Sequence, residues 1–202
     1  MSNVIIAQLL ESKMIKNLKT KIYGVFISKF YYLSLLIKKH SRIISPLKLD
    51  GIRNFNIGKY VTVNKSAWLA AMPLTGENVE LVIEDGTVIG HFAHIYATKS
   101  IRIEKKVLIA DKVYISDNLH GYENPEIPII DQPIVQKKPV IIGEGSWIGE
   151  NVCIIGASVG KHCVIGANAV VTKDVPDCCV AVGNPAKVIK KYNFETKNWE
   201  RC

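Results

Sequence analysis

Residues 140–175 read VIIGEGSWIGENVCIIGASVGKHCVIGANAVVTKDV, and an aliphatic side chain recurs in this stretch at nearly every sixth position. The same spacing extends back along the chain, and its positions are Ile83, Ile89, Ile95, Ile103, Ile109, Ile115, Ile142, Ile148, Ile154, Val159, Ile165 and Val171. An α-helix buries a face every 3.6 residues and a strand every second residue, so neither explains a period of six. Six residues per flat face and three faces per turn predict an all-β solenoid of parallel strands.

Two other positions of the six-residue repeat support this interpretation. The residue after the aliphatic one is often small, as expected where the backbone turns a corner: Gly90, Ala110, Gly143, Gly149, Gly160 and Gly166. Four residues after the aliphatic one comes a second small or β-branched side chain, which we expect to point inward: Thr87, Ala93, Val107, Val113, Ser146, Val152, Ser158, Cys163, Ala169 and Val175. An all-β sandwich is the alternative, but sandwiches lack a fixed period over about a hundred residues.

The composition separates a basic leader from the rest of the chain. The 202 residues are 48% hydrophobic, enough for a substantial core. Of the 26 basic and 18 acidic residues, nine basic and two acidic ones fall in residues 1–50, which leaves 17 and 16 for the remainder. We expect no nucleic-acid partner. The five cysteines form no CxxC pair, which favours a reducing compartment, and no signal peptide or membrane span is evident, so we expect a cytoplasmic protein.

Residues 1–50 are predicted to form a basic helical extension. Between residues 4 and 40, Ile22, Phe26, Leu33 and Ile37 recur at helical spacing with lysines between them, which predicts one or two amphipathic helices. Two interpretations stay open. The apolar stripe packs on the solenoid or on a neighbouring subunit, or the helix lies on an anionic membrane surface as a peripheral contact.

The predicted solenoid spans residues 51–186, and a tail of residues 187–202 follows it. One segment inside the solenoid, SDNLHGYENPEIPIIDQPIVQKKP at residues 116–139, contains four prolines and cannot continue a solenoid strand. It must leave the body as a loop, which we place at residues 120–139. Long loops on a rigid scaffold are often functional.

His120 stands where the strand pattern gives way to this loop, three residues after Asp117. A neutral imidazole can accept a proton at physiological pH, and a nearby carboxylate can fix the tautomer of the ring. Taken alone, a loop histidine is more often a solvated surface residue than a base, so His120 and Asp117 are at this point only candidate catalytic residues, which the family resemblance below selects.

Several segments together resemble the hexapeptide-repeat acyltransferases, in particular the sugar O-acetyltransferase branch that includes maltose, galactoside and bacterial polysaccharide acetyltransferases. These segments are DNLHGYENPEIPI (117–129), IIGEGSWIGENV (141–152), VIGANAVVTKDVP (164–176) and GNPAKVIKKY (183–192). The resemblance covers about residues 57–192. It implies a left-handed parallel β-helix, an exception to the right-handed crossover rule. It also implies a homotrimer with acetyl-CoA in the groove between neighbouring subunits.

By the same resemblance, His120 deprotonates the acceptor hydroxyl as it attacks the thioester, so transfer is direct. The resemblance also implies that the acceptor is a small molecule or an oligosaccharide. A surface polysaccharide or its precursor is the expected example. The residues implied to contact acetyl-CoA are Trp147, Ala167, Thr172, Lys173, Lys187 and Lys190. The chain departs from the family pattern at Asn118, Leu119 and Glu150, and the step from Ile154 to Val159 is one residue short, which should tighten or bulge a corner.

Three other functions are alternatives to O-acetyl transfer. An N-acetyltransferase of a nucleotide-linked amino sugar would use the same fold, base and cofactor. A metalloenzyme resembling the γ-type carbonic anhydrases would need three metal-binding histidines, which His91 and His94 do not supply convincingly, so no metal is expected. A non-catalytic binding module would have no reason to combine a loop histidine with a CoA-type C-terminal coil.

Overall fold

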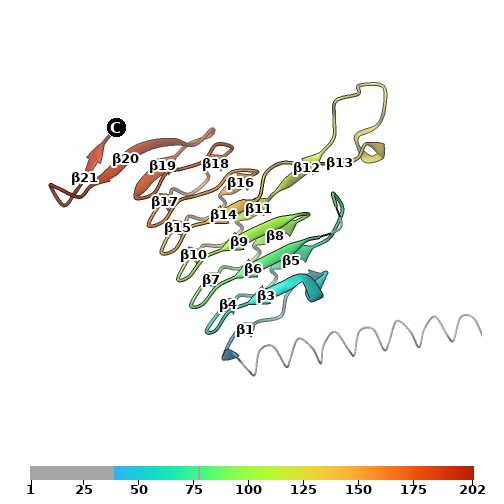
Figure 1. Ribbon diagram of the computed structural model, residues 1–202, viewed down its shortest axis with the longest axis horizontal. Helices are drawn as coiled ribbons and strands as arrows, with labels where there is room; N and C mark the ends of the chain where they lie inside the picture. Colours follow the sequence, from blue (N-terminus) through green and yellow to red (C-terminus); the bar gives the residue numbers. More distant parts are fainter. Residues whose placement is uncertain (1–38, 77) are drawn as a thin grey trace, which may run out of the picture. The chain divides into compact units, whose positions relative to one another are not determined.

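The computed structural model describes residues 39–76 and 78–202 (Figure 1). Their regular structure is almost entirely β-strand, with two short 3₁₀ helices at Ile52–Asn54 (η1) and Ile129–Asp131 (η2). The helices predicted between residues 4 and 40 lie outside the described residues, apart from Lys39 and His40. None of the helices in the described part of the chain is long and apolar enough to cross a membrane.

The strands form three long sheets and one short ribbon. Sheet A contains, in spatial order, β1 (Arg42–Ile43), β4 (Thr62–Val63), β7 (Val88–Ile89), β10 (Leu108–Ile109), β15 (Trp147–Ile148), β17 (Val164–Ile165), β19 (Cys179–Val182), β20 (Lys187–Asn193) and β21 (Asn198–Arg201). Sheet B contains β2 (Lys48–Asp50), β5 (Trp68–Ala71), β8 (His94–Ala97), β11 (Tyr114–Ser116), β16 (Cys153–Ile155) and β18 (Val170–Val171). Sheet C contains β3 (Phe55–Ile57), β6 (Glu80–Ile83), β9 (Ser100–Ile103) and β14 (Val140–Ile142), and the ribbon pairs β12 (Asn118–His120) with β13 (Ile134–Gln136).

From β1 to β19, apart from the ribbon β12–β13, the chain visits sheets A, B and C in turn, and strands of successive turns pair in parallel. For example, Ile89 of β7 is the partner of Ile109 in β10, and Ile95 of β8 is the partner of Ile115 in β11. The successive rungs stack as Figure 1 shows. This arrangement confirms a solenoid of parallel strands.

The core of the coil consists of the aliphatic side chains that define the six-residue period. All twelve are at most 1% exposed. The second predicted inward position is also buried in nine of its ten residues, and only Ser158 is half-buried. Because full burial of one such aliphatic side chain stabilises the fold by about 1.5–3 kcal/mol, these two columns explain why the chain coils.

Close approach of neighbouring turns accounts for the small residues at the corners. A Cβ atom added to Gly90 would lie 2.4 Å from the carbonyl carbon of Ala110, and one added to Gly143 would lie 2.5 Å from that of Gly160. No side chain fits such a gap without moving the backbone of the next turn. The predicted role of these positions is thus confirmed.

Strands flank residues 51–186 at both ends. Strands β1 and β2 precede residue 51 and pair with β4 and β5, so the first turn already includes residues 42–50. At the other end, residues 187–201 form the antiparallel strands β20 and β21, which extend sheet A.

Candidate active site

The proline-containing loop leaves the coil at the corner between sheets B and C. We call this the BC corner; among the described residues it comprises the connections at residues 51–54, 72–76, 78–79, 98–99, 117–139, 156–158 and 172–174. Strand β11 ends at Ser116, the ribbon β12–β13 follows, and the chain rejoins sheet C at Val140. Figure 1 shows the ribbon and its tip projecting from the stacked rungs. The ribbon thus carries His120 away from the core.

Asp117 is fully buried at the root of this loop, and its carboxylate accepts five hydrogen bonds. Oδ1 accepts from the backbone N–H (2.8 Å) and the hydroxyl (3.1 Å) of Thr98, and from Nδ2 of Asn118 (2.9 Å). Oδ2 accepts from the backbone N–H groups of Lys99 and Ser100, both at 2.8 Å. These bonds occupy the lone pairs of the carboxylate. Asp117 therefore holds the preceding turn of the BC corner and makes no hydrogen bond to His120.

Gln136 fastens the other strand of the ribbon to the same place. Its Nε2 donates to the carbonyl oxygen of Asp117 at 2.8 Å, and the backbone N–H of Lys137 donates to that oxygen at 2.9 Å. Its Oε1 accepts from the hydroxyl of Thr75 and lies 3.0 Å from the hydroxyl of Thr98, whose one hydrogen it shares with Oδ1 of Asp117. The ribbon is thus fixed at its base by side chains from three separate segments.

The return strand of the loop also lies against the shortened step of the coil. Gly156 has a positive φ of 55°, and a Cβ atom added to it would lie 2.5 Å from Cβ of Lys137. The neighbouring Lys138 bonds to the carboxylate of Asp174 at the same corner. At the shortened step the coil and the return strand of the loop therefore approach too closely for a side chain at position 156.

His120 is the last residue of β12 and is the Cα partner of Ile134. Its side chain is exposed, and no hydrogen bond joins the imidazole to another residue in the described part of the chain. The next backbone N–H, of Gly121, donates to the carbonyl of Pro133 at 2.9 Å. The imidazole therefore stands on an anchored backbone with its ring nitrogens available to a bound molecule.

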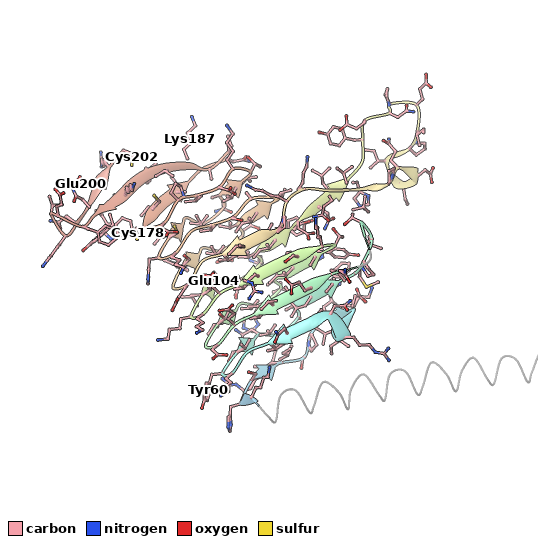
Figure 2. All side chains as sticks on the ribbon, viewed as in Figure 1. Tyr60, Glu104, Cys178, Lys187, Glu200 and Cys202 are labelled. Atoms are coloured by element: carbon pink, nitrogen blue, oxygen red, sulfur yellow. The ribbon has the colours of Figure 1, made fainter. Side chains whose placement is uncertain are left out.

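The residues implied to bind acetyl-CoA lie in separate places on the coil. Trp147 is on the outward face of sheet A and is 50% exposed. Lys190 is on that face too, as the partner of Val180. Lys187 begins β20 and extends its side chain away from the coil (Figure 2).

The other three predicted cofactor residues are exposed at corners. Ala167 lies between sheets A and B, two residues after the end of β17. Thr172 and Lys173 follow β18 at the BC corner, as His120 follows β11. In a three-sided coil the face of one sheet lies opposite the corner between the other two. One copy of the chain therefore does not bring Trp147 and Lys190 together with His120.

An aromatic column on the outward face of sheet B was not predicted. Trp68, His94 and Tyr114 occupy the same register position, and the rings of Trp68 and His94 are stacked 4.2 Å apart. Nε1 of Trp68 donates to Asp50 at 2.9 Å. Desolvation by burial lowers the pKa of His94, and its Nε2 is buried without a hydrogen-bond partner among the described residues. Counting the hexads from Ile95 would have placed these three residues in one outward column.

His91 lies instead at the corner between sheets A and B, where its backbone N–H donates to Oδ1 of Asp111 at 2.7 Å. Within residues 39–76 and 78–202, no group of three or more His, Cys, Asp or Glu side chains is placed to hold a metal ion.

Comparisons with known proteins agree with this architecture. The family described as the hexapeptide repeat of succinyl-transferase matches residues 139–173. A putative lipopolysaccharide biosynthesis O-acetyl transferase, WbbJ of Escherichia coli K12, is 35% identical over 179 residues, which cover 84% of this chain and 89% of that protein. The probable acetyltransferase Rv3034c of Mycobacterium tuberculosis is 41% identical over 117 residues, 57% of this chain and 38% of that protein.

Solved structures share the fold at lower identity. AntD, an N-acyltransferase from Bacillus cereus in complex with dTDP-4-amino-4,6-dideoxyglucose and coenzyme A, aligns with a TM-score of 0.65 at 17% identity, over 82% of this chain and 91% of AntD. The acetyltransferase domain of PglB from Neisseria gonorrhoeae, in complex with acetyl coenzyme A, aligns with a TM-score of 0.52 at 24% identity, over 72% and 57%. The chain belongs to the hexapeptide-repeat acyltransferase family. It is therefore an acyl-transfer enzyme.

Proposed function

We propose that this enzyme transfers an acetyl group from acetyl-CoA to a sugar hydroxyl of a surface polysaccharide or its precursor, with His120 as the general base. The observation that carries the proposal is the exposed imidazole of His120 on a ribbon whose base is fixed by Asp117 and Gln136. The similarity to WbbJ over 84% of this chain supports a hydroxyl of a cell-surface saccharide as the acceptor.

In the proposed reaction a neutral nitrogen of His120 accepts the proton of the acceptor hydroxyl while its oxygen attacks the thioester carbonyl. The carbonyl oxygen gains negative charge, which backbone N–H donors typically stabilise in such reactions. The carbon–sulfur bond then breaks, the CoA thiolate leaves, and the imidazolium returns the proton to the sulfur. A positioned base of this kind contributes about 10² to 10⁴ in rate.

Asp117 takes a positioning role in this scheme. Its lone pairs are already used by Thr98, Lys99 and Ser100, so it is not available to orient the imidazole. Instead it fixes the point at which the ribbon leaves the coil. This assignment differs from the catalytic role predicted from the three-residue spacing to His120.

We further propose a homotrimer of left-handed β-helices, with acetyl-CoA bound between copies. The placement of the candidate residues supports this assembly, because Trp147 and Lys190 lie opposite the corner that carries His120, Thr172 and Lys173. Two copies side by side can supply both groups to one site. In this assembly Lys187 and Lys190 attract the phosphates, and Ala167, Thr172 and Lys173 contact the remainder of the cofactor.

We propose a basic extension at residues 1–50, whose residues 42–50 also contribute strands β1 and β2 to the first turn of the coil, a β-helix domain at residues 51–186 and a tail at residues 187–202. We place the enzyme in the cytoplasm, where acetyl-CoA is made, with the basic extension either on a neighbouring subunit or on the membrane surface.

The N-acetyltransferase alternative rests on the fold shared with AntD, whose structure holds an amino sugar nucleotide. An acceptor screen separates the two functions. Purified enzyme is incubated with acetyl-CoA and a panel of sugars, amino sugars and nucleotide-linked sugars, and each product is examined by mass spectrometry before and after hydroxylamine treatment. We expect an added acetyl group that hydroxylamine removes, as for an ester. A stable amide would show that nitrogen is the acceptor, and transfer to none of the saccharides would contradict the proposed class of acceptor.

A further inference from the structure

The BC corner carries two long connections with one short connection between them. The described residues 72–76 leave the coil after β5, the chain turns within Thr98 and Lys99 after β8, and residues 117–139 follow β11. Figure 1 shows both long connections projecting from the same side of the stacked rungs. With strands about 4.8 Å apart, the rungs that carry them are about 10 Å apart. Side chains of residues 72–76, which we call the 72–76 segment, can therefore reach the base of the ribbon.

The ribbon turns the face that bears His120 toward this segment. Side chains alternate along a strand and Cα partners share a face, so His120 lies on the same face as Asn118 and Gln136. Both of these amides bond to earlier turns. Nδ2 of Asn118 donates to the carbonyl of Tyr96 at 3.2 Å, and Oε1 of Gln136 accepts from the hydroxyl of Thr75. His120 is two residues farther along the ribbon, about 7 Å away, so a molecule bonded to its imidazole has the segment beside it.

The backbone of the 72–76 segment is constrained on both sides of Leu74. Met72 donates its N–H to the carbonyl of Ala97 at 3.0 Å, and the ring of Pro73 fixes its own φ. The N–H of Leu74 returns to the carbonyl of Met72 at 2.8 Å. On the other side, the hydroxyl of Thr75 bonds to the ribbon. Because this backbone is ordered before a ligand arrives, little conformational entropy is lost when one binds.

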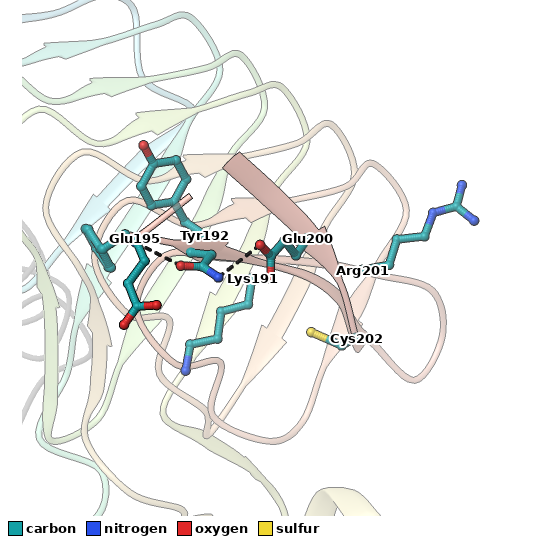
Figure 3. A pocket seen from close by; sticks show the side chains of 8 residues that line it. Lys191, Tyr192, Glu195, Glu200, Arg201 and Cys202 are labelled. Carbon is teal, nitrogen blue, oxygen red and sulfur yellow. Dashed lines mark hydrogen bonds between the residues drawn. The ribbon is translucent and has the colours of Figure 1, made fainter. Parts of the chain in front are cut away.

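Leu74 is the large apolar side chain that this constrained turn exposes, at 49% of its surface. Exposure alone does not indicate a binding role. Phe194 is 72% exposed and lines a shallow pocket of about 530 Å³ in the last hairpin (Figure 3), at the edge of sheet A and away from the ribbon. Leu74 differs because the residue after it is tied to the strand that pairs with the strand of His120.

We propose that the 72–76 segment binds the acceptor saccharide, with Leu74 packed against the apolar C–H face of the sugar ring whose hydroxyl reaches His120. This inference rests on the proposed function and makes Leu74 a specificity-determining residue for it. Thr75 is a positioning residue, because its hydroxyl holds the segment against the ribbon. An apolar contact of this kind is present in the ground state and in the transition state alike. It therefore lowers KM for the acceptor and leaves kcat unchanged.

Steady-state kinetics with the best acceptor of the saccharide panel, varied at saturating acetyl-CoA, test this assignment. Leu74→Ala should raise KM for that acceptor about three- to tenfold, with kcat and KM for acetyl-CoA within about twofold of wild type. The matched control is Leu47→Ala, since Leu47 is 71% exposed at the corner between sheets A and B, directly before β2. This control should stay within about twofold of wild type in all three constants.

A second pair of variants tests the tie between the segment and the ribbon. Thr75→Val keeps the shape of the side chain and removes the hydroxyl, so kcat/KM for the acceptor should fall at least about threefold. Thr75→Ser keeps the hydroxyl and should restore the wild-type value to within about twofold. Equal values for Thr75→Val and wild type would show that the tie does not position the segment.

The outcomes separate this inference from the proposed function. Wild-type enzyme that acetylates none of the saccharides overturns both. Active wild type, with Leu74→Ala equal to it or changed only in KM for acetyl-CoA, overturns the acceptor assignment alone. Sedimentation velocity of the same variants tests another occupant of this surface. If Leu74→Ala sediments as a smaller species than wild type and keeps the wild-type KM for the acceptor, Leu74 packs against a second copy and the assignment is wrong.

Discussion

Replacing Asp117 with Asn tests whether this residue fastens the catalytic ribbon or acts in the chemistry. An asparagine side chain keeps one acceptor oxygen and replaces the other by an NH₂ group. If the oxygen stays with Thr98, the NH₂ group faces the backbone N–H groups of Lys99 and Ser100, which lose their acceptor. Each unsatisfied donor costs about 1–3 kcal/mol, so the free energy of unfolding should fall by about 2–6 kcal/mol.

Thermal unfolding measures this loss. For a chain of this size each kcal/mol lowers Tm by about 2–4 °C, so Asp117→Asn should lower Tm by at least about 4 °C. Asp85→Asn is the matched control, because exposed Asp85 accepts a single backbone bond, from Lys59 at 2.7 Å through Oδ1, which asparagine retains. The control should change Tm by less than about 2 °C. Equal Tm values for the two variants would refute the reasoning.

Kinetics below the unfolding temperature complete the test. A positioning role predicts that Asp117→Asn loses less than about 100-fold in kcat and keeps the wild-type pH profile. Loss of an orienting carboxylate would cost about 10⁴. A variant with wild-type Tm, a loss near 10⁴ and an altered pH profile would show that Asp117 is part of the chemistry.

Three further predictions follow from the structure. Replacing both Lys187 and Lys190 with Ala should raise KM for acetyl-CoA about 5- to 30-fold and leave KM for the acceptor nearly unchanged. The reason is that each of these charges contributes about 0.5–1 kcal/mol to phosphate binding. A change in the KM for the acceptor alone would contradict their assignment. Ile109→Ala, at a core position that is 1% exposed, should lower the free energy of unfolding by about 2–5 kcal/mol in denaturant titration, and a loss below 1 kcal/mol would question the packed core. Burial lowers the pKa of His94 below its usual 6.5, so the unfolded chain binds a proton more readily than the folded one, and stability that is present above pH 6.5 should decline as the pH falls below it. His94→Phe should flatten this decline in Tm between pH 7.5 and 5.5, and an unchanged slope would exclude His94 as its source.

The core and the turns of the coil were predictable because they depend only on local periodicity. A six-residue period places Ile142, Ile148 and Ile154 on three successive faces whatever lies between them. The loop was predictable for a similar reason, since prolines exclude a ladder strand. The exposed position of His120 followed from its place beside that break.

Relations between neighbouring turns were harder to predict, because they depend on side-chain reach across the stack. Asp117 bonds to Thr98, a residue of the preceding turn, and nothing in the local pattern distinguishes this from a bond to His120. The outward column that contains Trp68 and Tyr114 likewise depends on which residues of successive turns are paired. Gln136 bonds to the carbonyl of Asp117 because it is the Cα partner of Asn118 in the ribbon β12–β13. The positions of the prolines predict a loop but do not predict this pairing.

The most direct test of the central claim compares acetyl transfer by two histidine variants at saturating acetyl-CoA, using the acceptor identified in the screen. His120→Asn removes the proposed base, and His162→Asn removes another exposed histidine, at a positive φ of 52° that asparagine tolerates. We expect His120→Asn to lower kcat at least about 100-fold with unchanged affinity for CoA, and His162→Asn to stay within about twofold of wild type. Near-normal turnover of His120→Asn would contradict the account.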